Sequence, residues 1–207
     1  MSRLGREFFA RDSLTVAREL LGQRLVRVIE ARRLSGRIVE AEAYIGEEDA
    51  ACHASAGRTQ RTEVMYGPPG YAYVYFVYGM HHCLNVVTER EGFPAAVLIR
   101  AIEPEEGLEV IQANRPGRPD AELMDGPAKL CQALRIDQRL NGVDLCTSDE
   151  LFLERAEPVP EVKIVATPRV GVRGDEAALN APWRFYVMKP PARSEPSNSK
   201  YGHVAWY

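Results

Sequence analysis

The pattern of apolar and polar positions predicts more strands than helices in this chain. β-Branched and aromatic residues mark strands at residues 23–31, 37–44, 70–78, 83–88 and 95–102, the last closed by residues 103–104. The strongest pattern is the run YAYVYFVY at residues 71–78, and Gly79 and Met80 after it predict a hairpin with Tyr78 beside its tip. Weaker patterns indicate further strands around Leu151, Ile164, Val170 and Phe185.

Helix signals are fewer and shorter. Asp12 or Ser13 can cap a helix that ends near residue 21, before Gly22. Residues 107–114 fit a second helix, and Asp125 fits the cap of a third, with Pro127 in its first turn. Residues 46–69 hold glycine, proline and charge and predict a long irregular segment, which in a compact domain is often functional.

These elements favour a mixed α+β domain. Strands joined by hairpins or loops, without regular strand–helix–strand alternation, argue against a parallel doubly wound sheet. The chain has 207 residues and 45% hydrophobic content, which suits a single domain over residues 1–207. Prolines and serines predict a loose tail from about residue 189.

Composition indicates where the protein is located and what its cysteines do. The chain has no apolar run long enough to span a membrane, and its first residues lack the apolar stretch of a signal peptide. We therefore expect a cytoplasmic protein without membrane contact, and the compact chain favours a bacterial source. No C-x-x-C pair occurs, so we expect buried apolar residues, without disulfide or metal roles, at Cys52, Cys83, Cys131 and Cys146.

Net charge gives little support for a nucleic-acid partner. The formal net charge is -3, which argues weakly against nucleic acid. All basic residues in the first hundred positions are arginines, whose planar guanidinium suits phosphate, so a local basic face is compatible with an acidic protein. From charge alone, a solvated surface of mixed sign is the favoured interpretation.

A set of chemically capable side chains is predicted to gather on the sheet. Alternate positions of a strand face the same side, so two strands and one loop histidine are placed to share a face. The set comprises Glu40, Glu42, Tyr44, His53, Tyr71, Tyr73 and Tyr75. Rings above and below could hold a flat aromatic ligand, and a glutamate beside it could take a proton from water. Strand tyrosines usually serve packing, however, so this pattern alone leaves the ligand open.

Metal and nucleotide motifs are missing from the sequence. It contains no G-x-G-x-x-G, Walker, H-E-x-x-H or G-x-S-x-G motif. His81 and His82 are adjacent on a predicted strand and point to opposite faces, so they are poorly placed to share one ion. We expect no metal site.

Six sequence blocks, in order, carry a family resemblance. They are VEAEAYIG with ACH at 39–53, YVYFVYGM with CLNV at 73–86, LIRAIEP at 98–104, GPAKLCQAL at 126–134, PRVGV at 168–172 and RFYV at 184–187. Together they resemble the alkyladenine (3-methyladenine) DNA glycosylase family over residues 8–187. The resemblance implies a curved, largely antiparallel sheet with a protruding hairpin that inserts into DNA, and no cofactor.

The resemblance also implies a pocket for a base flipped out of duplex DNA. Tyr44 matches the residue that stacks on one face of that base, and His53 and Tyr75 match those on the other face. Asn85 matches a residue that obstructs the amino group of normal guanine. Electron-poor alkylated purines are favoured by such π faces.

Catalytic roles are carried over in the same way. Glu42 matches the general base that activates water for attack on the sugar C1′, and Arg100 matches a residue that supports the water and a nearby phosphate. Tyr78, with Met80 at the same hairpin tip, matches the residue that fills the gap left in the duplex. No lysine nucleophile is implied, so the product is an abasic site in an uncut strand, made by a monomer acting on duplex DNA.

Two departures and two alternatives remain. His81 stands where vertebrate members carry a larger aromatic residue, and Asp125 stands where Asn or Ser is usual, so we expect different DNA contacts there. The chain could be a non-catalytic nucleic-acid-binding module of the same fold, although Glu42 beside a phosphate backbone argues against it. It could instead act on free nucleosides, although a small substrate leaves no gap for Tyr78 to fill.

Overall fold

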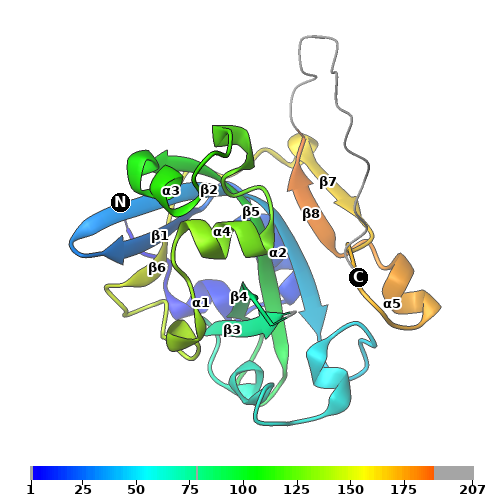
Figure 1. Cartoon of the computed structure of the whole chain (residues 1–207). Coiled ribbons are helices and arrows are strands. Elements are labelled where there is room, and N and C mark those ends of the chain that lie inside the picture. The colour runs from blue at the N-terminus through cyan, green and yellow to red at the C-terminus, as the bar shows by residue number, and fades with distance from the viewer. Residues whose placement is uncertain (1, 78, 189–207) are drawn as a thin grey trace.

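An antiparallel sheet organises the chain (Figure 1), and the computed structural model describes residues 2–77 and 79–188. Within this part, eight strands form one open sheet in the order β3-β4-β5-β2-β1-β6, with β8 added to β2 and β7 to β8. Their bounds are β1 Arg24–Ile29, β2 Arg32–Ile45, β3 Ala72–Val77, β4 His81–Val87, β5 Ala95–Glu106, β6 Leu151–Glu154, β7 Ile164–Thr167 and β8 Arg184–Val187. The expected mixed α and β fold with an antiparallel sheet is confirmed.

Strand β2 is the axis of this sheet, because three other strands pair with it. Residues 32–37 pair with β1, residues 40–42 pair with β8, and β5 pairs along nearly the whole strand. The β2–β5 register shifts on both sides of Glu40, as at a β-bulge, which bends a strand and increases its twist. The half of β2 beyond this bulge carries Glu42 and Tyr44.

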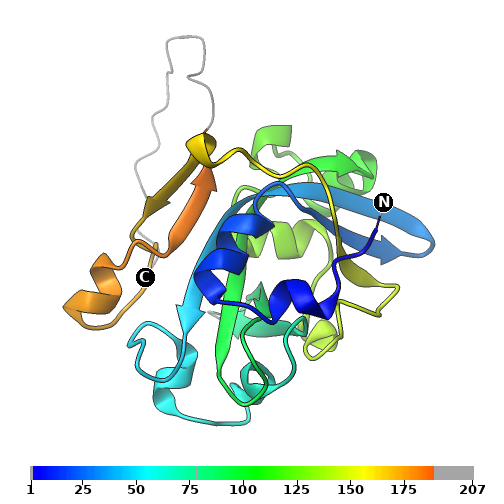
Figure 2. The ribbon, with the colours of Figure 1, turned by 180° about the vertical axis from the view of Figure 1, so that it is seen from behind.

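Helices lie on both faces of the sheet. In Figure 1 α3 (Leu108–Asn114) and α4 (Pro127–Ala133) lie in front of it, and in Figure 2 α1 (Arg6–Phe9) and α2 (Ser13–Leu20) do. Asp12 caps α2, as expected, accepting a hydrogen bond from the Thr15 backbone at 2.9 Å. α5 (Glu176–Asn180) lies beside β7 and β8. Short 3-10 turns are His53–Ala56, Glu63–Tyr66, Asp120–Glu122, Gln138–Leu140 and Glu161–Lys163.

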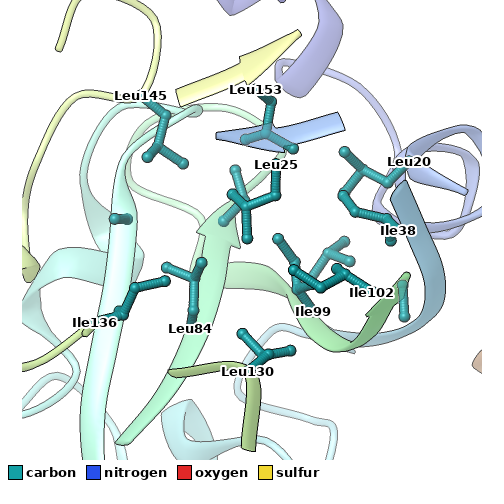
Figure 3. Packing of buried hydrophobic residues seen from close by; sticks show 14 of the residues in the cluster. Leu20, Leu25, Ile38, Leu84, Ile99, Ile102, Leu130, Ile136, Leu145 and Leu153 are labelled. Carbon is teal, nitrogen blue, oxygen red and sulfur yellow. The ribbon is translucent and has the colours of Figure 1, made fainter. Parts of the chain in front are cut away.

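The apolar core joins these layers. Leu20 from α2, Leu25 and Ile99 from the sheet, and Leu130 from α4 belong to one buried cluster (Figure 3). A smaller cluster, including Cys52, Met65 and Tyr73, fills the space under the segment between β2 and β3. All four cysteines are free, as expected, and three are buried. None of the described helices is long and apolar enough to cross a membrane.

Two sequence predictions about elements are wrong. Residues around Val170 form no strand, because this segment leaves the sheet and its backbone N–H is used by a side chain instead. Asp125 does not cap α4: the cap residue is Gly126, and the Asp125 carboxylate binds the Lys129 ammonium at 2.9 Å. The hairpin prediction is confirmed in β3 and β4, whereas Tyr78 lies outside the described residues, as does the tail from residue 189.

Strand β5 also runs further than predicted. It continues through Pro104 to Glu106. Pro104 lies opposite Gly36, where the β2–β5 register shifts, and a bulge is one of the few places where a sheet tolerates proline. A Cβ on Gly36 would lie 2.4 Å from the Glu103 carbonyl oxygen, so this close approach needs glycine.

Truncation in the core tests the packing. Leu25 is 0% exposed in the main cluster, so Leu25→Ala should lower the free energy of unfolding by about 2–5 kcal/mol, through lost burial and a residual cavity. Val162 is 85% exposed and serves as the control, so Val162→Ala should change the free energy of unfolding by less than about 0.5 kcal/mol. Urea titration measures both, and equal effects of the two substitutions would contradict the assigned core.

Candidate active site

Two adjoining cavities open where the second half of β2 meets the β3–β4 hairpin. Their volumes are about 500 and 370 Å³, and both are lined by Tyr44, Tyr75, Val77 and Gly171. His53, Tyr73 and Asn85 line the larger one. Arg100, Cys83 and Leu98 line the smaller one. Because several lining residues are common to both, the two cavities are together called the aromatic hollow.

Glu42 lies directly behind this hollow and is 0% exposed. Its Oε2 accepts hydrogen bonds from the Tyr44 hydroxyl at 2.8 Å and from Arg100 Nη1 at 3.2 Å. Its Oε1 accepts one from the Val170 backbone N–H at 2.8 Å. All three partners are donors, which fits an ionised carboxylate, and all three line the smaller cavity.

Arg100 joins Glu42 to a second carboxylate. Its Nε donates to Glu40 Oε1 at 2.8 Å, and Arg184 Nε donates to the same oxygen at 2.7 Å. Burial alone would lower the pKa of Arg100, but Glu42 and Glu40 outweigh it and raise that pKa. The predicted shared face of Glu40, Glu42 and Tyr44 therefore holds across the bulge, and two arginines balance two glutamates.

His53 is neutral near pH 7. Burial, with a smaller contribution from the Arg61 charge, lowers its pKa to about 4. Arg61 approaches Nε2 at 3.4 Å and can only donate, so Nε2 accepts and the proton lies on Nδ1. Nδ1–H then donates to the Tyr73 hydroxyl at 2.9 Å. One wall of the hollow is therefore an uncharged imidazole in a fixed orientation.

The tyrosines of the hollow keep their protons. Burial raises the pKa of Tyr75, and burial together with the Glu42 charge raises the pKa of Tyr44 strongly. The rings of Tyr75 and His53 meet edge to face with centroids 4.5 Å apart. These uncharged aromatic surfaces, with a carboxylate directly behind them, suit a flat heterocycle and a reaction that needs a base.

The remaining predicted residues divide between the hollow and the hairpin tip. Asn85 is buried in the hollow, and its Nδ2 donates to the Tyr73 carbonyl at 3.0 Å. Met80 is 69% exposed at the hairpin turn and lines neither cavity of the hollow. Tyr78 lies outside the described residues. The structure thus brings six predicted residues together: Glu42, Tyr44, His53, Tyr75, Asn85 and Arg100.

Sequence reasoning missed two features of the site. The Val170 N–H that binds Glu42 comes from a segment that the pattern predicts as a strand. The ion pair of Asp49 and Arg169 lies behind Tyr44, and the cation–π contact between Arg169 and that ring spans 4.8 Å. The pair spans 120 positions in the sequence, so no local pattern signals it, although Arg169 lies inside the PRVGV block.

The low pKa of His53 predicts a loss of stability in acid. The unfolded chain takes up this proton near pH 6.5 and the folded chain only near 4, so stability falls as pH falls through that window. Between pH 7 and 5 the loss from this group should be about 1–2 kcal/mol. His53→Asn keeps a donor toward Tyr73 but cannot titrate, so it should lose less stability in urea titrations over this range. Identical losses in both proteins would contradict the assignment.

Comparison with known proteins finds relatives along nearly the whole chain. A family model described as methylpurine-DNA glycosylase matches residues 7–191. A protein of Methanocella arvoryzae named "Putative 3-methyladenine DNA glycosylase" is 54% identical over 197 residues, which cover 94% of this chain and 97% of that protein. Proteins with the same name from Desulfitobacterium hafniense and Carboxydothermus hydrogenoformans are 53% and 52% identical, over 90% and 89% of this chain and 96% and 94% of their own lengths. The resemblance in the sequence motifs is thereby confirmed, and the chain belongs to the methylpurine-DNA glycosylase family.

Proposed function

We propose that this protein is a monofunctional DNA glycosylase that flips damaged purines out of duplex DNA and hydrolyses the bond between base and sugar. The observation that carries the proposal is the fully buried Glu42 carboxylate against the wall of an aromatic hollow. The substrates would be 3-methyladenine and other alkylated purines, together with hypoxanthine. The enzyme would act as a monomer in the cytoplasm.

The flipped base would occupy the aromatic hollow. Tyr44 would stack on one face, with His53 and Tyr75 on the other. A neutral His53 supports this role, because an imidazolium would repel the positive charge of an alkylated purine. Asn85, buried and anchored to the Tyr73 carbonyl, would obstruct the amino group of normal guanine.

Glu42 would take a proton from the attacking water as the base departs. Arg100 and the Val170 N–H hold its carboxylate in place, and Tyr44 links it to the ring that stacks on the base. A general base in this position contributes typically about 10²–10⁴-fold to the rate. Arg100 would also favour the phosphate of the flipped nucleotide, since its guanidinium lines the smaller cavity.

The product would be an abasic site in an intact strand. Lys129 lines the smaller cavity, but its ammonium is paired with the Asp125 carboxylate at 2.9 Å. A charged ammonium is not a nucleophile, so covalent attack by this lysine on the sugar is disfavoured. Water would be the attacking group.

The β3–β4 hairpin would hold the duplex open. Met80 is 69% and Phe76 49% exposed at its tip, and large apolar side chains that project in this way can wedge between base steps. Tyr78, between them in the sequence, would enter the gap left by the flipped nucleotide, with Met80 beside it.

Excision by a carboxylate variant tests the function. Glu42→Gln keeps the shape of the side chain and removes its basicity, so excision of hypoxanthine from a labelled duplex should fall by about 10²–10⁴-fold while duplex binding changes little. Alkali after the reaction reveals abasic sites, and breaks should appear only after alkali. Release of 3-methyladenine from alkylated DNA is measured in parallel. Normal turnover by Glu42→Gln would refute its role, and a folded wild type that binds DNA but releases neither base would indicate a non-catalytic module.

The stacking role of Tyr44 has a matched pair of variants. Tyr44→Phe keeps the ring and loses only the hydroxyl that donates to Glu42, so binding of lesion-containing duplex should stay near wild type. Tyr44→Ala removes the ring and should weaken that binding by about 1–3 kcal/mol, the typical contribution of one base–aromatic stack. Fluorescence anisotropy measures both affinities, with undamaged duplex as reference. Unchanged lesion binding by Tyr44→Ala would place the base elsewhere.

A further inference from the structure

A buried ion pair lies on the far side of the Tyr44 ring. Arg169 Nη1 and Nη2 donate to the two carboxylate oxygens of Asp49 at 2.6 and 2.8 Å, and the side chains are 0% and 1% exposed. Neither residue lines the aromatic hollow. The pair is therefore shielded from solvent and from any occupant of the hollow.

Ring contacts and hydrogen bonds hold the Arg169 guanidinium in place, and only its Nε has no partner among the described residues. It lies between the rings of Tyr44 and Trp183, with its centre 4.8 and 4.9 Å from the ring centroids. Its Nη atoms also donate to the carbonyls of Ala43, at 3.0 Å, and Ala178, at 3.1 Å. Its Nε is buried and finds no hydrogen-bond partner in the part of the chain that the structure describes.

Asp49 extends this framework into the loop that leads to His53. Its carboxylate also accepts from the backbone N–H groups of Ile45, at 3.2 Å, and Ala51, at 3.1 Å. The 3-10 turn that begins at His53 follows directly. One carboxylate thus links the end of β2 to the wall that carries the imidazole.

Arg169 is also connected to Glu42 through the backbone of the next residue. Val170 follows it, and the Val170 N–H is the donor to Glu42 Oε1 at 2.8 Å. This segment lies outside the strands, so no sheet ladder places that N–H. The position of the donor therefore depends on how Arg169 is held.

We propose that Arg169, clamped by Asp49, is a positioning residue for the reaction: it holds the Tyr44 ring from behind and aims the Val170 N–H at Glu42. This inference rests on the proposed function. Burial of an ion pair is weak evidence for a gain in stability, and the unpartnered Nε adds a cost. What the planar guanidinium supplies, and an ammonium cannot, is a stack between two rings together with hydrogen bonds in several fixed directions.

The test compares two Arg→Lys substitutions. Arg169→Lys keeps a positive charge beside Asp49 but loses the stack and the paired hydrogen bonds. Arg24→Lys is the control, because Arg24 is also a largely buried arginine paired with a carboxylate, that of Glu105 at 2.5 Å, and it lines neither cavity of the hollow. Single-turnover excision of hypoxanthine, duplex affinity and the pH–rate profile are measured for each protein, well below its thermal midpoint.

We expect Arg169→Lys to slow single-turnover excision by about 10–100-fold, because small misplacements of catalytic groups cost that much. Affinity for the lesion duplex should change by less than about 3-fold. The acid limb of the pH–rate profile should move to higher pH, because a carboxylate that loses a hydrogen-bond donor takes up a proton more readily. Arg24→Lys should lower the thermal midpoint while leaving the excision rate and the pH–rate profile unchanged.

Each result has a defined meaning. A folded Arg169→Lys with the wild-type rate and pH profile would overturn the positioning role, whatever its stability. If Arg169→Lys does not fold, Asp49→Asn provides the test, since it weakens the ion pair while leaving Arg169 between the rings. A wild-type rate and pH profile of Asp49→Asn would then overturn the inference. Failure of the wild type to excise any lesion would refute the proposed function. Excision by the wild type but not by Glu42→Gln would support that function, and the rate of Arg169→Lys then tests the positioning role by itself.

Discussion

The fold around the site depends on one buried carboxylate. A glutamate with no solvent exposure is tolerated only where hydrogen-bond donors replace the water it has lost. The donors to Glu42 come from three places in the chain: β2 itself through Tyr44, β5 through Arg100, and an irregular segment far along the chain through Val170. Satisfying that single side chain therefore constrains the β2–β5 register, the bulge beside Glu40 and the course of the chain between β7 and α5.

Most of the charge close to Glu42 is balanced or removed. Arg100 and Arg184 compensate Glu40 and Glu42, and burial keeps His53 neutral and Tyr44 and Tyr75 protonated. The faces of Tyr44, His53 and Tyr75 carry no formal charge, and the Glu42 carboxylate lies behind them. These faces offer shape and stacking to a flat ligand, whereas charged side chains such as Arg61 and Arg100 line other parts of the hollow.

Much of the fold and of the candidate site could be predicted from the sequence, and the features that could not be predicted have physical reasons. Period-two alternation placed Glu40, Glu42 and Tyr44 on one face, and the motif order led to Tyr75, Asn85 and Arg100. The path of β5 through Pro104 could not be predicted, because the glycine and bulge that tolerate it lie on another strand. Asp125 looks like a helix cap locally, yet Lys129 one turn later competes for its carboxylate. The Asp49–Arg169 pair joins residues 120 positions apart, and tertiary packing alone brings them together.

The two walls of the hollow have different origins, and this gives the protein a modular site. Tyr44, Tyr75, Asn85 and the groups that hold Glu42 belong mainly to the sheet and are fixed by its ladders. Much of the larger cavity, including His53 and Arg61, is lined by the irregular segment between β2 and β3. Loops accept sequence change more readily than paired strands do. Sequence change, or loop grafting between relatives, can therefore reshape the larger cavity through that one segment, while Glu42, Tyr44 and Arg100 in the sheet stay in place.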